Sequence, residues 1–432
     1  MSTLLQRFGP GRRVPAPRRG PAQRLAAPSL TQQSGLHFTE WLLIGVLSVA
    51  YLLSISQPLF GIQLHLTLLN HFALLLLGPA LALHLVGVLL NRASIPLSTI
   101  LAHCWPLVLL ALFALVGSSV AKWEYKQPDT YISFGVYLLL LPLYMAVVPA
   151  QVERVAVWAK VLLGLWLVAS LAALAGEVAG FASRVASLHE IEYLVICGFF
   201  GLYYASPSKA IKLLALLLMT AAALLNQKLT GYIILTLALV HILAAAGWRR
   251  LPQQTRPVYA VVAVLLTTAL AALLTTLYFE FRPFLPSGNA HVRMPLYEAA
   301  LRQFVQSPVW GSAFLDGSGE GYRDAARLLY IPTHSDVLDI LKHGGLIGLT
   351  LFVAGYGMLF VLLNRAVSAT RTLGISNAYF VAVRFFLVTA ALTFAINPIL
   401  LKGPFLIVIW GNLGLAAGLA LRVLASKAGE KT

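Results

Sequence analysis

Apolar runs long enough to cross a membrane recur along nearly the whole of this sequence. A spanning helix needs roughly 20 apolar residues to cross the hydrocarbon core of a bilayer, and about twelve runs approach or reach that length. Of the 432 residues, 59% are hydrophobic and only 11% are charged, whereas about a quarter of the residues in a soluble domain are charged. We therefore predict an all-α integral membrane protein with about twelve transmembrane helices.

The predicted spans divide the chain into five parts. The runs are centred on residues 42–59, 68–90, 97–120, 131–148, 155–175, 191–205, 211–225, 233–248, 258–279, 346–363, 378–397 and 405–424. In chain order, the parts are a basic tail (1–37), nine spans (38–280), a long segment of mixed polarity (281–345), three spans (346–424) and a short tail (425–432). We expect the first tail to be a disordered cytoplasmic arm whose arginines contact anionic membrane lipids.

The distribution of charge predicts the orientation of the spans. With the N-terminus inside, 20 of the 31 basic residues but only three of the 15 acidic residues fall on the inner side. This excess follows the positive-inside rule, so both termini are predicted to be cytoplasmic and the segment 281–345 is predicted to face outward. The net charge of +16 is thereby explained by topology, and we predict no nucleic-acid partner.

The outward segment 281–345 holds the strongest candidates for chemistry, because the bilayer core tolerates neither charge nor irregular backbone cheaply. Arg293 stands just before a predicted short amphipathic helix, whose first turn contains Pro295. A guanidinium beside a helix N-terminus favours binding of an anion. The simpler alternative is an arginine that contacts a lipid headgroup.

His334 begins a second predicted helix in this segment, which ends at residues 344–345. Thr333 or Ser335 can cap that helix, and Asp336 suits its first turn. The positive end of a helix dipole disfavours the imidazolium ion and leaves a neutral ring able to accept a proton. The alternative is a polar residue that only faces water.

Three further basic residues lie alone at outward helix ends: Arg184, Lys228 and Lys402. Together with Arg293 they are candidates to point into one outer cavity. Interfacial contact with lipid is the alternative for Arg184, and a structural role is the alternative for Lys228. The sequence shows no His/Cys cluster with metal-ligand spacing and no nucleotide-binding glycine motif, so we expect no metal or other cofactor.

The outward segment resembles the O-antigen ligase family over about 56 residues. The matching positions are Arg293-x3-Tyr297, Pro308-x2-Gly311, His334-Ser335-x2-Leu338 and Gly345-Leu-Ile-Gly348. The family pattern usually has Trp at the position of Tyr297 and Asn at the position of Ser335. The remainder of the chain is similar in the number and orientation of its predicted helices.

The resemblance implies a glycosyltransferase of the bacterial inner membrane with a periplasmic site. Such an enzyme moves a whole polysaccharide from undecaprenyl pyrophosphate to a sugar hydroxyl of lipid A–core, without nucleotide sugar or metal. It also implies that Arg293 and His334 are functional residues, with Arg184 a looser match and Lys228 a candidate for another family arginine. Tyr297 and Lys402 complete the set of candidate substrate contacts.

Elementary chemistry agrees with these roles. Cleavage between sugar C1 and a pyrophosphate oxygen leaves a stable anion, which needs fixed positive charge more than a general acid. Arg293 and Arg184 can contact the pyrophosphate in a bidentate way, and His334 can accept the proton of the attacking hydroxyl. In-line displacement would invert the anomeric centre.

Four other readings remain open on the sequence. An O-antigen polymerase would use the same donor with a second polyprenyl-linked glycan as acceptor, and a protein O-oligosaccharyltransferase belongs to the same superfamily. A twelve-helix secondary transporter would show repeat symmetry and polar groups at mid-membrane, where only Arg384 stands; we interpret Arg384 as a snorkelling or structural charge. A metal-dependent oligosaccharyltransferase would need paired acids, and outer acids such as Asp129 and Glu177 form no such motif.

Overall fold

The structure is a computed structural model, and it describes the greater part of the chain from residue 95 onward. The described residues are 40–45, 48, 82, 86, 95–124, 131–149, 151–178, 192–226, 229–250, 290–315, 333, 335–397, 399–400 and 403–429. These residues form helices and connecting turns without any β-strand, so the predicted all-α class is confirmed for this part of the chain.

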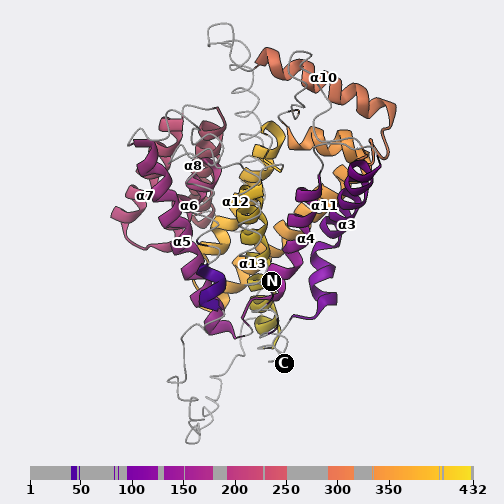
Figure 1. Ribbon diagram of the computed structural model, residues 1–432. Coiled ribbons are helices and arrows are strands. Elements are labelled where there is room, and N and C mark those ends of the chain that lie inside the picture. Colours follow the sequence, from indigo (N-terminus) through magenta and orange to yellow (C-terminus); the bar gives the residue numbers. More distant parts are fainter. Residues whose placement is uncertain are drawn as a thin grey trace, which may run out of the picture. The chain divides into compact units, whose positions relative to one another are not determined.

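Ten helices are bounded within the described residues (Figure 1). In chain order they are α3 (Leu97–Trp123), α4 (Ile132–Ala146), α5 (Val152–Val178), α6 (Glu192–Ala205), α7 (Lys209–Asn226), α8 (Leu229–Arg250), α10 (Ala290–Gln306), α11 (Asp336–Thr372), α12 (Ala378–Ile396) and α13 (Gly403–Gly429). Nine of these helices match predicted spans in the same chain order. Most of their ends differ from the predicted ends by only a few residues. The largest difference is at α11, which ends nine residues beyond the predicted span 346–363.

Six helices of the described part are long and apolar enough to cross a membrane. They lie in α3, α5, α8, α11, α12 and α13, while α4 and α6 contain shorter apolar helices. The protein is therefore a membrane-spanning helical protein. The predicted spans at 42–59, 68–90 and 258–279 lie wholly or largely outside the described residues, as does the basic tail.

Helix α13 packs closely on α4 through two glycines one turn apart. A Cβ on Gly414 would come within 2.5 Å of the Tyr144 Cβ, and one on Gly418 within 2.5 Å of the Met145 carbonyl oxygen. Small residues at this spacing let helix backbones approach closely in a bilayer, where dispersion contacts replace the hydrophobic effect as the cause of association. α4 also packs on α3, and α11 packs on both α3 and α13. Helices α3 and α13 thus hold α11 in this group.

A second set of contacts joins α5, α6, α7, α8 and α12. Arg384 of α12 lies within this set and donates to Asn364 Oδ1 of α11 at 2.7 Å, and its second terminal nitrogen lies 2.8 Å from His241 Nε2 of α8. The other ring nitrogen of His241 bonds the Tyr204 hydroxyl of α6 at 3.0 Å. The predicted structural role of Arg384 is thus supported, because its guanidinium links helices rather than standing alone at mid-membrane.

Two contacts join helix ends that the charge pattern predicts to lie on the same side of the membrane. Arg154 forms an ion pair with Glu40, and the Glu40 carboxylate also accepts a hydrogen bond from Trp158 Nε1 at 3.2 Å. Glu40 and the start of α5, which carries Arg154 and Trp158, are both predicted to lie on the cytoplasmic side. At the other predicted side, Asp336 bonds the backbone of the connection between α12 and α13. Ends assigned to one side by the sequence therefore meet one another in the fold.

Candidate functional site

A turn at residues 307–315 inserts into a break in helix α11. Gly345 has φ 60° and ψ −160°, so α11 consists of a short arm before this residue and a long span after it. This break agrees with the predicted helix end at residues 344–345. Backbone N–H groups beyond the break donate to the turn: Leu346 to the Pro308 carbonyl at 2.9 Å and Ile347 to the Val309 carbonyl at 3.2 Å.

The same turn satisfies the carbonyls that the break leaves free. Ser312 N donates to the Lys342 carbonyl at 3.1 Å, and Phe314 N donates to the His343 carbonyl at 3.0 Å. The turn itself needs positive φ at Gly311 (60°), Ala313 (54°) and Phe314 (59°). Positive φ is uncommon away from glycine, and strain of this kind persists only where surrounding contacts over-determine the backbone.

Phe314 anchors the turn to two membrane helices. Its side chain is fully buried, and its ring lies 5.3 Å from that of Phe113 in α3 and 5.4 Å from that of Tyr131, which precedes α4. Gly117 of α3 leaves room for the turn, since a Cβ there would overlap the Ala313 carbonyl. The turn is therefore fixed by α3 and α4 as well as by α11.

A buried polar cluster surrounds the first residues of α11. Ser335 is the N-cap, and its Oγ accepts from Leu338 N at 3.3 Å, which confirms one of the two predicted caps. The other candidate, Thr333, instead donates through Oγ1 to the Ser335 carbonyl at 2.9 Å, and its backbone N–H donates to Asp339 Oδ1 at 3.3 Å. His334 itself lies outside the described residues, yet both of its neighbours in sequence are buried and hydrogen-bonded.

Asp336 connects the start of α11 to the segment that precedes Lys402. One carboxylate oxygen accepts from Ile399 N at 2.8 Å, and the other accepts from Leu400 N at 3.1 Å. A carboxylate that accepts several backbone N–H bonds is a strong, charge-assisted anchor. Lys402 lies outside the described residues. Leu400, two residues before Lys402 in the sequence, bonds Asp336, which is two residues after His334.

Lys342 and His343, one turn after Asp339, are fully buried, and sequence reasoning did not assign them a role. His343 Nδ1 lies 3.1 Å from Ser312 Oγ of the inserted turn, and its ring lies 4.7 Å from that of Tyr131. Both residues interact electrostatically with the buried carboxylate of Asp339. In the sequence, Asp339 stands three residues before Lys342 and four residues before His343, and two glycines follow directly. This spacing is the sequence signal that marks the cluster.

Helix α10 carries Arg293 and Tyr297 and packs on α11. It begins at Ala290, so Arg293 lies inside the first turn rather than before the helix, and Pro295 lies one turn in. The predicted apolar face is present, with Leu296 and Ala300 fully buried. Arg293 and Tyr297 are four residues apart and both half-buried, so they lie on neighbouring positions of one helix face.

The structure therefore brings together some of the predicted site residues and leaves others undescribed. Arg293 and Tyr297 lie on α10, which packs on α11 and leads into the turn at residues 307–315 that bonds to both sides of the break in α11. Arg184, Lys228, His334 and Lys402 lie outside the described residues. Among the residues that are described, no three His, Cys, Asp or Glu side chains gather as a metal site.

Comparison with known proteins places a family domain over this unit. A family model described as O-antigen ligase matches residues 214–353, from α7 to the middle of α11. The matched range contains the motif positions from Arg293 to Gly348. These include Gly311 of the inserted turn and Gly345 at the break. No curated protein matches the chain. The resemblance predicted from the motifs is thus confirmed at residues 214–353, which match the O-antigen ligase family model.

Proposed function

We propose that this protein is an O-antigen ligase of the bacterial inner membrane. It transfers polysaccharide from undecaprenyl pyrophosphate to a sugar hydroxyl of lipid A–core on the periplasmic side. The family domain and the membrane-spanning helices support this assignment at the level of the superfamily. The single structural observation that carries it is the locked turn at residues 307–315, which joins α10 to the arm of α11 that begins beside His334.

Arg293 acts on the pyrophosphate in this proposal. The bond between sugar C1 and the pyrophosphate oxygen breaks, and the electron pair leaves with that oxygen. Two guanidinium N–H groups can contact the charged oxygens together, and burial of the helix face around Arg293 strengthens such a contact. Arg184 and Lys228 add positive charge to the same leaving group, while Tyr297 and Lys402 contact the substrates.

His334 acts on the acceptor. A neutral imidazole accepts the proton of the attacking hydroxyl as the new bond to C1 forms, so one displacement inverts the anomeric centre. Thr333 and Ser335, its neighbours in sequence, are buried and hydrogen-bonded.

The reaction in this proposal uses no metal or nucleotide sugar. Fixed guanidinium groups supply the positive charge that a cation supplies in other glycosyltransferases. The apolar helices around the site hold the polyprenyl chain of the donor, and both lipid-anchored substrates approach through the outer leaflet.

The test is transfer by the purified protein with polyprenyl-pyrophosphate glycan and lipid A–core as the two substrates. Gel analysis should show glycan attached to lipid A–core, and a ladder of longer polyprenyl-linked glycans in its place would identify a polymerase. Arg293→Lys should lose most of the activity because a lysine keeps the charge without the planar fork. Arg302→Lys is the matched control, since Arg302 lies on the same helix, is exposed and pairs with Glu298 at 3.3 Å.

The two proposed roles are separated by donor binding and by pH. His334→Ala should bind the donor as the wild type does, yet lose transfer by roughly 10²–10⁴-fold, the usual contribution of a general base. It should also lose the fall in rate at low pH, since a protonated imidazole cannot accept a proton. If His334→Ala weakens donor binding as much as Arg293→Ala and keeps the wild-type pH profile, the base assignment is wrong.

A further inference from the structure

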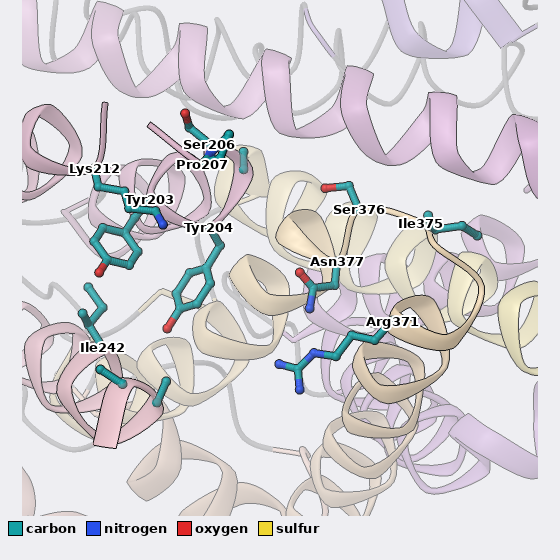
Figure 2. Close-up of a pocket in the computed structure, with 13 residues that line it drawn as sticks. Tyr203, Tyr204, Ser206, Pro207, Lys212, Ile242, Arg371, Ile375, Ser376 and Asn377 are labelled. Carbon is teal, nitrogen blue, oxygen red and sulfur yellow. The ribbon is translucent and has the colours of Figure 1, made fainter. Parts of the chain in front are cut away.

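A cavity of about 450 Å³ lies at the opposite end of α11 from the candidate site (Figure 2). The connection between α6 and α7, the end of α8, and the connection between α11 and α12 surround it. In Figure 2, Arg371 and Asn377 lie on one side of the cavity, and Tyr203, Tyr204 and Lys212 lie on the other. All of these helix ends belong to the side that the charge pattern predicts to be cytoplasmic.

The cavity is electropositive. Lys212 and Arg371 contribute its two charged side chains, and no acidic residue is found among the described residues that line it. The Lys212 ammonium lies 5.7 Å from the centroid of the Tyr203 ring, a cation–π contact that keeps the charge in place without neutralising it. The cavity therefore offers two cationic groups from different helices to one bound anion.

Backbone and side-chain donors add to this charge. Asn377 is the N-cap of α12, and its side chain makes no capping hydrogen bond. The first N–H groups of a helix have no partner within the helix and carry partial positive charge. Ser206 and Ser376 also line the cavity and provide hydroxyl donors. The combination of two cations, hydroxyls and a helix start matches the several acceptor oxygens of a phosphate group.

The wall of the cavity is fixed by the bonds of Arg384. Tyr204 lines the cavity, and its hydroxyl bonds His241 of α8, which in turn lies against Arg384 of α12. Arg384 reaches Asn364 of α11 at 2.7 Å. Three helices of the wall are thus cross-linked to α11, so the cavity is preformed and does not require ordering when a ligand binds.

Apolar surface next to the cavity indicates the nature of the ligand. On α7, Leu213 and Leu217 are 57% and 58% exposed, and on α8 Leu243, adjacent to the cavity residue Ile242, is 69% exposed. Exposed leucines beside an electropositive cavity suit acyl chains that hang from a bound phosphate. We infer that this cavity binds the phosphate-bearing headgroup of an anionic membrane lipid at the cytoplasmic leaflet, a site separate from the proposed transfer reaction.

The probes are short-chain phosphatidylglycerol, phosphatidylcholine and inorganic phosphate, added to the delipidated full-length protein in uncharged detergent. Thermal unfolding is followed at increasing concentration of each, since a ligand that binds only the folded protein raises its Tm. Phosphatidylglycerol should raise the Tm in a saturable way, and phosphatidylcholine should not. Lys212→Ala/Arg371→Ala should need about 25-fold more phosphatidylglycerol for the same rise, at about fivefold for each basic residue removed.

Two further variants keep the result interpretable. Lys209→Ala/Arg365→Ala removes one basic residue from each of the same two helices outside the cavity and should respond like the wild type. Asn377→Asp keeps a good N-cap but places a negative charge in the cavity, so it should fold normally and lose the response. Equal responses of the cavity and control variants would overturn the inference. A rise caused by inorganic phosphate and not by phosphatidylglycerol would also overturn it, in favour of a soluble phosphate compound.

Discussion

Substitution of Gly345 by alanine tests whether the break in α11 holds the site together. At φ 60° and ψ −160°, Gly345 occupies a region that is essentially restricted to glycine. A Cβ at this position would also lie 2.4 Å from the Val309 carbonyl oxygen and 2.5 Å from Gly311 N. The obstructing atoms are backbone atoms of the inserted turn, so they cannot move aside as a flexible side chain would.

The expected cost has two parts. Backbone strain at a residue in this region contributes about 1–3 kcal/mol, and forcing extra volume into a packed site contributes about 1–3 kcal/mol more. The sum is roughly 2–6 kcal/mol, which at about 2 °C per kcal/mol corresponds to a fall in Tm of about 4–12 °C. If the turn moves away instead, the four backbone hydrogen bonds that join it to α11 are lost.

Gly357→Ala is the matched control, because Gly357 lies on the same helix and a Cβ there would meet nothing within 4 Å. Unfolding is measured in detergent with a thiol-reactive dye, since Cys104 and Cys197 are both buried and become reactive only on unfolding. Gly311→Ala should also destabilise, and its effect should not add to that of Gly345→Ala, because the two glycines are in contact. Equal Tm values for Gly345→Ala and Gly357→Ala would refute the reasoning.

Three further outcomes are expected. A cysteine introduced by Ser318→Cys should react with an impermeant reagent from outside, while Ser368→Cys should be spared; the reverse pattern would invert the proposed topology. Asp336→Asn should lower the Tm, with a loss of about 1–3 kcal/mol of stability, because a neutral amide oxygen is a weaker acceptor than the carboxylate and its NH2 group replaces an oxygen that faces Leu400 N; Glu298→Gln, at an exposed ion pair, should leave the Tm unchanged. Transfer should continue in excess chelator, and activity that returns only on adding Mg²⁺ or Mn²⁺ would support the metal-dependent alternative.

The sequence by itself determined the helical membrane class and most helix positions in the described part. Both follow from a local quantity, the length of each apolar run. It also limited the N-cap to Thr333 or Ser335 and predicted the break before residue 346, because a capping hydroxyl and a glycine pair act through their own backbone. The motif positions were recognisable for the same reason, since they lie within one short stretch of chain.

The start of α10 was placed too late because Pro295 was taken as a first-turn residue. A proline is favoured at the first turn, where its missing N–H has no partner to lose. In the structure the helix starts at Ala290 and continues through Pro295. Leu296 and Ala300 are buried, as the apolar pattern predicts, so the packed face follows from the sequence although the first residue of the helix does not.

Only the tertiary structure decided which distant segments meet around the site. Nothing in the sequence near Asp336 indicates that its carboxylate binds the backbone at residues 399–400, or that the turn at 307–315 fills the break at Gly345. The burial of Lys342 and His343, and the cavity between α6, α8 and α11, depend on the same long-range packing. Hydrogen bonds between residues far apart in sequence leave no periodicity in the chain, because their geometry exists only after the helices have packed.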